Sequence, residues 1–369
     1  MSNILFVTWD GGGNVPPALG IAGELAARGH QVRFLGHENN AAQVAGRGLE
    51  FAPFTEARPF SCLEEHTPVE MMAIFGDRGM GTDLLAEVRR EAADLVVIDC
   101  LLMGATDAAR RAGLPYVSLE HLFDEYFRKR WMAGPLGLSG KARGLRPIRG
   151  INSARRALVA TLPELDPSSR RKQPGNLGYI GPVLRDPGPQ DLTGRPATIL
   201  VSLSTYNFGG MATSLQNILD ACADLPARVI VTTGPVVDPA ELRPPANAEV
   251  HRYVDHDELM PQATLVVGHG GHATTMRALA HDLPLVVMPM HPMLDQPMVG
   301  KAVQRAGAGR LVKKGDSPAA LRPVIEQLLG DGPHRQAAAR LGAAVRAMPG
   351  AVKGADEIEA LVRNGARQH

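Results

Sequence analysis

The sequence predicts an α/β protein made of two lobes. Short apolar strands alternate with helical segments in both halves of the 369-residue chain, and a stretch rich in Pro and Gly, residues 178–190, lies between the halves. The length also corresponds to about two domains of ordinary size. Each half therefore has enough chain to bury a core of its own.

The first half is expected to hold five strands. They cover residues 4–8, 31–35, 49–53, 95–99 and 116–119. Residues 17–28 carry apolar side chains at helical spacing and end before Gly29, a residue suited to a helix C-terminus. Residues 104–112 repeat that design.

Residues 55–90 are less regular and contain five large apolar side chains: Phe60, Met71, Met72, Phe75 and Met80. Two interpretations stay open. The side chains could pack in the core, or they could line an apolar pocket, since methionine adapts to ligands of varied shape.

The second half repeats the alternation of strands and helices. Its strands are expected at residues 198–203, 228–232, 249–253, 265–267 and 285–288. The Pro-rich connector places the domain boundary so that residues 1–185 form the first domain and 186–369 the second. A last helix over residues 355–362 could pack on either domain. Ligands of such sheets bind at the carboxyl ends of strands, so we expect the site in a cleft between the lobes.

Charge and cysteine content exclude several classes of function. There are 39 basic and 38 acidic residues, a net charge of +1, so no overall field attracts nucleic acid or anionic lipid. The three cysteines, Cys62, Cys100 and Cys222, form neither a disulfide framework nor a zinc pattern. No segment has the length of a membrane span or of a signal-peptide core. We expect a cytoplasmic protein with a small-molecule partner, no nucleic acid and no membrane; a homodimer is left open.

The basic runs at residues 128–130, 155–156 and 170–172 lack interleaved aromatic residues and are interpreted as solvated faces. Asp255 and Glu258 are spaced as a helix N-cap and its partner rather than as a metal site. The Gly run at residues 11–13 lacks the G-x-G-x-x-G spacing of a dinucleotide loop, which argues against an oxidoreductase.

The most informative motif follows the strand at residues 265–267. It comprises Gly268, His269, Gly270, Gly271, His272, Ala273, Thr274 and Thr275. Paired glycines let backbone N–H groups approach a ligand, and the helix expected over residues 273–280 would present its N-terminus, which favours phosphate. His269 would add a charged or hydrogen-bonding group, and Thr274 a hydroxyl. The strand at residues 285–288 then leads to Asp295 and Gln296.

This ordered combination resembles the family 1 glycosyltransferases of the GT-B fold, especially bacterial enzymes that attach deoxysugars to antibiotics and other natural products. The resemblance covers nearly the whole chain. It implies two Rossmann-like domains that face each other across a cleft, the first binding the acceptor and the second a nucleotide-sugar donor. It also implies that the C-terminal helix could cross back to the first domain.

The resemblance assigns roles to individual residues of the second domain. His269 and the N–H groups of Gly270, Gly271, Ala273 and Thr274 would hold the donor diphosphate, and Asp295 with Gln296 would bond sugar hydroxyls. Arg252, Tyr253 and Val254 would border the base, and Ser204 would contact the phosphates. His272 belongs to the same set, with a loop or surface role as its alternative. Arg277 stands where many relatives have a glutamate for the ribose, which leaves ribose recognition open.

The first domain departs from the family at the position of the general base. Many relatives have His-x-x-Pro after the first strand, but here the matching residue is Asn14, whose amide cannot take a proton. Asp10 is the first candidate to replace it, because the glycines at 11–13 would let it turn inward. Asp99, at the end of the strand 95–99, is second, and His121 is third. A base outside this set, or none, is a further alternative.

The implied activity is inverting transfer of a deoxyhexose from a TDP- or UDP-sugar to an apolar natural product, at a hydroxyl or alternatively at carbon or nitrogen. No obligatory metal or other cofactor is expected, since a helix N-terminus can neutralise a diphosphate and the histidines show no metal-ligand spacing. Two alternatives remain. One is a catalytically weak GT-B protein that binds nucleotide or assists another transferase, and the other is a sugar-nucleotide epimerase.

Overall fold

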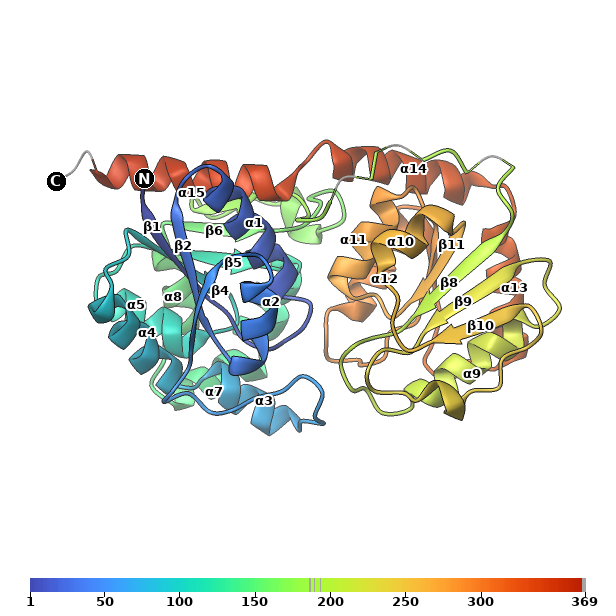
Figure 1. Cartoon of the computed structure of the whole chain (residues 1–369), viewed down its shortest axis with the longest axis horizontal. Helices are drawn as coiled ribbons and strands as arrows, with labels where there is room; N and C mark the ends of the chain where they lie inside the picture. Colours follow the sequence, from blue (N-terminus) through green and yellow to red (C-terminus); the bar gives the residue numbers. More distant parts are fainter. Residues whose placement is uncertain (186, 189, 193, 367–369) are drawn as a thin grey trace. The chain divides into compact units, whose positions relative to one another are not determined.

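The computed structural model describes residues 1–366 except 186, 189 and 193, and the chain divides into two compact units. Unit 1 consists of Met1–Cys62, His66–Leu184 and the C-terminal segment from Met348; unit 2 consists of Leu63–Glu65 and Arg185–Ala347. Residue 186, where the second domain was expected to begin, lies outside the described residues. Each unit has a parallel sheet with helices around it (Figure 1).

The sheet of unit 1 has the strand order β3-β2-β1-β4-β5-β6-β7, and every pairing is parallel. The strands are β1 (Asn3–Val7), β2 (Gln31–Gly36), β3 (Glu50–Pro53), β4 (Leu95–Asp99), β5 (Tyr116–Glu120), β6 (Arg156–Val159) and β7 (Leu177–Tyr179). The five predicted strands are present. β6 and β7 were not among them, because they have only four and three residues.

Helices connect these strands. They are α1 (Val15–Ala27), α2 (Ala41–Ala45), α3 (Pro68–Phe75), α4 (Gly79–Arg90), α5 (Met103–Arg111), α6 (Asp124–Tyr126), a π-helical segment (Phe127–Met132), α7 (Pro135–Ala142), α8 (Pro147–Ser153) and α15 (Gly350–Ala366). The irregular region 55–90 thus contains α3 and α4. Phe60, Phe75 and Met80 are buried there, so core packing is the correct interpretation for these three side chains, whereas Met71 and Met72 are half-buried.

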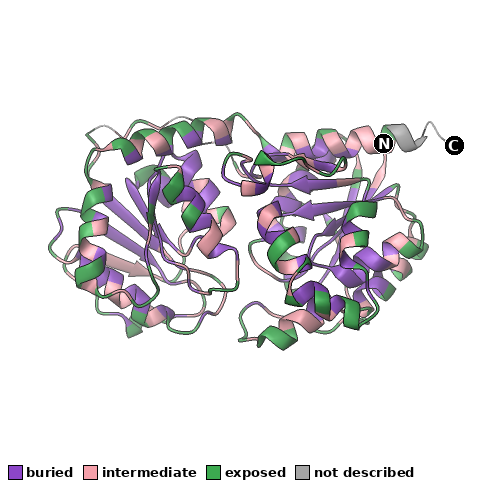
Figure 2. Cartoon of the chain, turned by 180° about the vertical axis from the view of Figure 1, so that it is seen from behind, coloured by how far each residue is buried: buried purple, intermediate pink, exposed green. Residues whose placement is uncertain are grey.

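The C-terminal helix α15 packs on α1 and belongs to unit 1. Ala355 and Ile358 on its inner face are fully buried, and Figure 2 shows much of the rest of the helix as intermediate or exposed. Arg28, the C-cap of α1, contacts Asp356 at 2.6 Å, and Arg156 contacts Glu357 at 2.8 Å. Apolar burial holds the helix in place, because partly exposed ion pairs contribute little.

The sheet of unit 2 has the order β10-β9-β8-β11-β12-β13 and is also parallel. The strands are β8 (Thr198–Ser202), β9 (Arg228–Thr232), β10 (Ala248–His251), β11 (Leu265–Gly268), β12 (Leu285–Val287) and β13 (Gly309–Leu311). Of these, the sequence missed only β13, an edge strand of three residues. The chain order reverses at β8, between β9 and β11, and ligands of such sheets bind at the carboxyl ends beside this reversal.

The helices of unit 2 are α9 (Met211–Cys222), α10 (His256–Leu259), α11 (His272–Ala280), α12 (Gln296–Arg305), α13 (Pro318–Leu329) and α14 (Pro333–Arg346). Asp255 caps α10 by accepting from the N–H of Asp257 at 2.9 Å, which confirms its predicted capping role, while the partner role of Glu258 stays a prediction.

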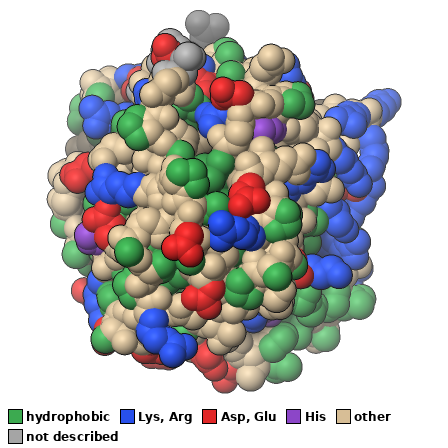
Figure 3. Space-filling model, turned by 90° about the vertical axis from the view of Figure 1, so that its right-hand side faces the viewer, with side chains coloured by type: hydrophobic (Ala, Val, Ile, Leu, Met, Phe, Trp, Pro, Cys, Tyr) green, Lys and Arg blue, Asp and Glu red, His purple; other side chains and the backbone are tan. Residues whose placement is uncertain are grey.

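Among the described residues, no helix combines the length and apolar character needed to cross a membrane. Figure 3 shows acidic and basic side chains intermixed over the centre of one side of the molecule, with basic side chains gathered at its edge. The centre of this surface is therefore neither strongly positive nor strongly negative.

Candidate active site

The loop between β11 and α11 is shaped by two glycines. Gly270 has φ +83°, a conformation that favours glycine, and Gly271 is the N-cap of α11. A Cβ on Gly271 would lie only 2.3 Å from Nε2 of His269, so a side chain there would displace the histidine ring. The loop thus brings the ring of His269 against the start of a nine-residue helix, where first-turn N–H groups can bind an anion.

His269 has an unfilled hydrogen-bonding position. Its Nδ1 is buried and has no hydrogen-bond partner among the described residues. Burial lowers the pKa of His269 to about 4, so the ring is neutral at neutral pH. Of the two roles considered for this residue, the neutral ring favours the hydrogen-bonding one. The ring of Phe208, which the sequence did not single out, lies beside it, with centroids 6.3 Å apart.

Asp295 and Gln296 lie next to this loop. Oδ2 of Asp295 is 3.9 Å from Nδ1 of His272, and both side chains are largely buried. Oε1 of Gln296 accepts hydrogen bonds from the backbone N–H groups of Met290 (2.8 Å) and His291 (3.0 Å). A Cβ on Gly270 would lie 3.0 Å from the backbone oxygen of Gln296. The structure therefore brings the glycine-rich loop and the Asp-Gln pair together.

The other predicted donor residues lie along the carboxyl edge of the same sheet. Ser204 follows β8, and its Oγ accepts from the N–H of Tyr206 at 2.9 Å. Tyr253 (77% exposed) and the half-buried Val254 follow β10 at the sheet's edge. Ala273, exposed, and Thr274, half-buried, are in the first turn of α11. Each of these residues stays a prediction for donor contact.

Arg277 lies further along α11 and contacts Asp257 of α10, with Nε 3.4 Å from Oδ1. Both side chains are partly exposed. The arginine that stands in place of the family's glutamate thus forms an ion pair within unit 2.

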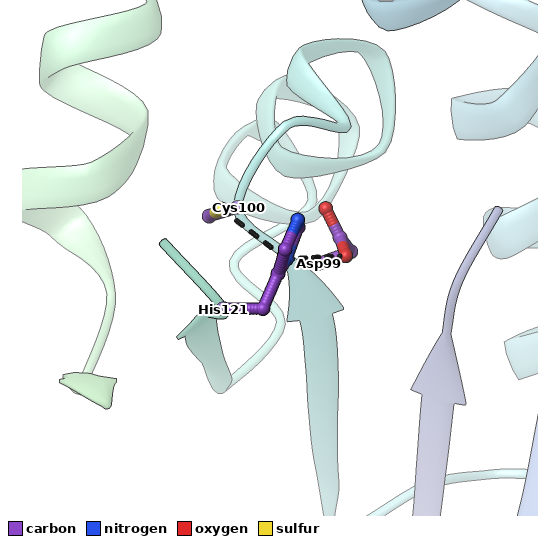
Figure 4. Close-up of side chains that lie close together, drawn as sticks. All are labelled: Asp99, Cys100 and His121. Carbon is purple, nitrogen blue, oxygen red and sulfur yellow. Dashed lines mark hydrogen bonds and ion pairs between the residues drawn. The ribbon is translucent and has the colours of Figure 1, made fainter. Parts of the chain in front are cut away.

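In unit 1, Asp99 joins two other candidates at the carboxyl ends of β1, β4 and β5, which are neighbours in the sheet. Its Oδ2 lies 3.2 Å from Nδ2 of Asn14 and 3.1 Å from Nδ1 of His121. Its Oδ1 accepts from the N–H of Leu101 at 3.0 Å. Figure 4 shows the Asp99 and His121 side chains side by side beyond the end of β4.

Comparison with known proteins agrees with this arrangement. The family described as erythromycin biosynthesis protein CIII-like, C-terminal domain, matches residues 216–361. The 4'-demethylrebeccamycin synthase of Lentzea aerocolonigenes is 27% identical over 98% of this chain and 100% of that protein. The uncharacterized UDP-glucosyltransferase YojK of Bacillus subtilis (strain 168) is 26% identical over 98% of each chain. The crystal structure of the glycotransferase of kitacinnamycin matches 98% of both chains at 26% identity, with a TM-score of 0.80.

The chain is a GT-B glycosyltransferase. Both the predicted fold and the predicted family are confirmed.

In the glycosyltransferase, the first candidate base, Asp10, makes contacts that differ from those of Asp99. Its Oδ2 accepts hydrogen bonds from Nδ2 of Asn39 (2.9 Å) and from the N–H of Cys62 (3.3 Å), and its own N–H donates to Nδ1 of His37 (3.3 Å). The carboxylate is buried. Asp10 therefore fastens residues 39 and 62 to the end of β1.

Asp99, Cys100 and His121 offer three potential metal ligands within 4.8 Å of one another (Figure 4). The chemistry of this group fits a metal poorly. Burial and the neighbouring carboxylates of Asp99 and Glu120 raise the pKa of the Cys100 thiol well above its usual range, whereas a metal ligand would be a thiolate. Oδ2 of Asp99 is already shared by two donors. In the glycosyltransferase Nδ1 of His121 instead contacts both Oδ2 of Asp99 (3.1 Å) and the sulfur of Cys100 (3.9 Å).

Glu120, the last residue of β5, is completely buried, a feature that the sequence analysis missed. Burial raises the pKa of its carboxyl well above the usual range, and Asp124 adds to this effect. Arg128 reaches Oε1 of Glu120 at 3.6 Å and also pairs with Asp124. The interpretation of residues 128–130 as a solvated face is thus wrong for Arg128, whose side chain points inward. An acidic residue that ends an apolar strand was the signal that could have indicated this network.

Proposed function

We propose that the protein is an inverting glycosyltransferase that moves a deoxyhexose from a TDP- or UDP-sugar to a hydroxyl of an apolar natural product. The observation that carries this proposal is the glycine-rich loop, where the unpartnered Nδ1 of His269 lies beside the start of α11 and the Asp295–Gln296 pair.

Donor binding would use neutral groups and the helix N-terminus. N–H groups of α11 would neutralise the diphosphate, and His269, being uncharged, would add a hydrogen bond. Positioned donors of this kind stabilise the charge that develops on the leaving diphosphate. Asp295 and Gln296 would bond sugar hydroxyls. No metal is needed for this arrangement, and we propose that none is used.

The aromatic residues of unit 1 support an apolar acceptor. Trp9 directly follows the residues of β1 and contacts Phe75 and Phe60, with ring centroids 4.8 and 5.3 Å apart, and Phe75 contacts Trp131 at 5.3 Å. Trp9, Phe60 and Phe75 are buried and Trp131 is half-buried, so an apolar acceptor would contact this cluster at Trp131. Such surfaces favour aromatic or aliphatic ligands.

The alternative of a weakly active auxiliary protein is motivated by Asn14, which cannot act as a base. Nucleotide binding without transfer to any acceptor would favour it.

Calorimetric titration of TDP and of UDP into the wild type, His269→Ala and a control, His30→Ala, tests the donor site. His30 lies in unit 1 and pairs with Glu359. Each titration is repeated with a chelator. We expect chelator-insensitive binding of one nucleotide to the wild type and the control, with at least a tenfold weaker affinity in His269→Ala. Failure of both nucleotides to bind the folded wild type would contradict the proposed function.

A further inference from the structure

We propose that His121 takes the proton from the acceptor hydroxyl, positioned by Asp99, while Asn14 serves only as a fixed hydrogen-bond donor to Asp99. This inference rests on the proposed transferase function. It places the base directly after β5, whereas the resemblance placed it at Asn14, after β1.

The orientation of the Asn14 amide follows from its neighbours. Nδ2 lies 3.1 Å from the carbonyl oxygen of Trp9, 3.2 Å from Oδ2 of Asp99 and 3.0 Å from Oγ1 of Thr8. The first two atoms accept hydrogen bonds and cannot donate, so the amide nitrogen must face them. Asn14 therefore donates to Asp99 in any protonation state of the active site and has no proton to exchange.

The same carboxylate favours one tautomer of His121. Nδ1 of His121 lies 3.1 Å from Oδ2 of Asp99, and a lone pair on Nδ1 would repel this carboxylate oxygen, so the proton is placed on Nδ1. The same Nδ1 is within hydrogen-bonding distance of the Cys100 sulfur, at 3.9 Å, and this contact is compatible with a proton on Nδ1 because a thiol sulfur can also accept weakly. Nε2 is thus the nitrogen with a free lone pair.

Nε2 is also the accessible nitrogen. Within the described part of the chain it has no hydrogen-bond partner. It is also not one of the fully buried polar atoms that lack a partner, so solvent can reach it. His121 keeps 8% of its surface exposed, beyond the end of β5. A ligand at the carboxyl edge of this sheet could therefore reach Nε2, as a general base requires.

The proposed step balances without a further reactant. The acceptor O–H bond breaks and its proton passes to Nε2 of His121, while the acceptor oxygen forms a bond to the anomeric carbon of the donor. The bond from that carbon to the diphosphate oxygen breaks, and the electron pair leaves with the nucleoside diphosphate. Asp99 stabilises the resulting imidazolium at its Nδ1–H. The imidazolium then loses its Nε2 proton to water.

Asp10 is the competing candidate, and its contacts argue against it. Its Oδ2 already accepts from Asn39 and Cys62, so two loops hold the carboxylate in place and only Oδ1 is left to take a proton. Both carboxylate oxygens of Asp99 have partners: Oδ2 contacts Asn14 and His121, and Oδ1 accepts from the N–H of Leu101.

The test compares His121→Asn and Asp10→Asn with the wild type, using two acceptors of the same aromatic skeleton. One carries an aliphatic alcohol and the other a nitrophenol that is already ionised at the assay pH. We expect His121→Asn to lose about 10²- to 10⁴-fold in kcat for the alcohol but less than about tenfold for the phenolate, with TDP affinity unchanged. A purely structural role would lower both rates together. We expect Asp10→Asn to change kcat by the same factor for both acceptors.

Nitrogen NMR of the imidazole supplies a readout that does not depend on turnover. We expect His121 to be protonated on Nδ1 in the wild type and to lose this preference in Asp99→Asn. Protonation on Nε2, or equal losses for the two acceptors, would overturn the inference while leaving the transferase function intact. Absence of transfer to any acceptor by the wild type would instead remove the proposed function and this inference with it.

Discussion

Nε2 of His269 lies where a side chain at residue 271 would have to be, since a Cβ on Gly271 would be 2.3 Å from it. The glycine and the histidine are thus one structural unit, and the position of the ring depends on the lack of a side chain two residues later.

Gly271→Ala should therefore displace the His269 ring and weaken nucleotide binding at least tenfold. Gly23→Ala, in α1, is the matched control because a Cβ there meets no atom within 4 Å. Titration of TDP and UDP checks both variants. Unchanged affinity in Gly271→Ala would show that the ring does not contribute to the donor site.

Gln296 is expected to have two separable roles. Its Oε1 holds the loop at Met290 and His291, while its Nε2 is proposed to contact the donor sugar. Gln296→Glu keeps an oxygen that accepts both N–H groups but loses the amide donor, so it should retain TDP affinity and raise KM for the intact sugar nucleotide. Gln296→Ala should impair both, because it also frees the loop. Calorimetry with TDP and steady-state kinetics with the sugar donor separate the two effects. Identical behaviour of the two variants would contradict the sugar contact.

His269 should also make unit 2 less stable in acid. Its pKa is lowered from 6.5 to about 4 in the folded protein. Above pH 6.5 the ring is neutral in both states and contributes nothing. As the pH falls from 6.5 to 4, the unfolded chain binds the proton and the folded chain does not, so the free energy of unfolding decreases, by at most about 3 kcal/mol.

The variant His269→Gln should accordingly show a flatter decline of unfolding free energy between pH 6.5 and 4.5. Urea unfolding followed by circular dichroism, without nucleotide, measures the difference from the wild type. That difference isolates His269 from the other buried histidines, such as His281 and His334, whose pKa values burial also lowers. Parallel pH dependence of the two proteins would contradict the burial of this ring.

The attachment of α15 to unit 1 should depend on apolar packing more than on ion pairs. Ile358→Ala removes a fully buried side chain and should cost about 2–4 kcal/mol. Arg28→Ala breaks pairs with Asp356 and Glu24 whose side chains are partly exposed, and should cost less than about 1 kcal/mol. Both tryptophans, Trp9 and Trp131, belong to unit 1, so fluorescence during urea unfolding reports on this unit. A larger effect of Arg28→Ala would reverse this ranking.

Central strands were the easiest elements to predict from the sequence. β4 and β9 have the predicted bounds, because a parallel strand covered on both faces is a continuous apolar run. β6 and β13 were missed since they have only four and three residues. The N-terminus of α11 was predictable because glycines and a helix start are local signals.

The partners of the candidate bases could not be predicted in this way. Asp99 and His121 are 22 positions apart and meet only because β4 and β5 pair in parallel. The ranking of Asp10 first depended on the freedom of the neighbouring glycines, and the sequence gives no sign that Asn39 and Cys62 would occupy its carboxylate. The neutrality of His269 likewise depends on burial by segments distant in the chain.

The central claim is transfer of a sugar from a nucleotide donor without a metal. Its most direct test is to incubate the protein with TDP- and UDP-deoxyhexoses and a panel of hydroxylated aromatic acceptors, with and without chelator, and to determine the anomeric configuration of any product by proton NMR. The account predicts a glycoside of inverted configuration, formed at the same rate with chelator. Nucleotide binding with no transfer to any acceptor, or a product of retained configuration, would contradict it.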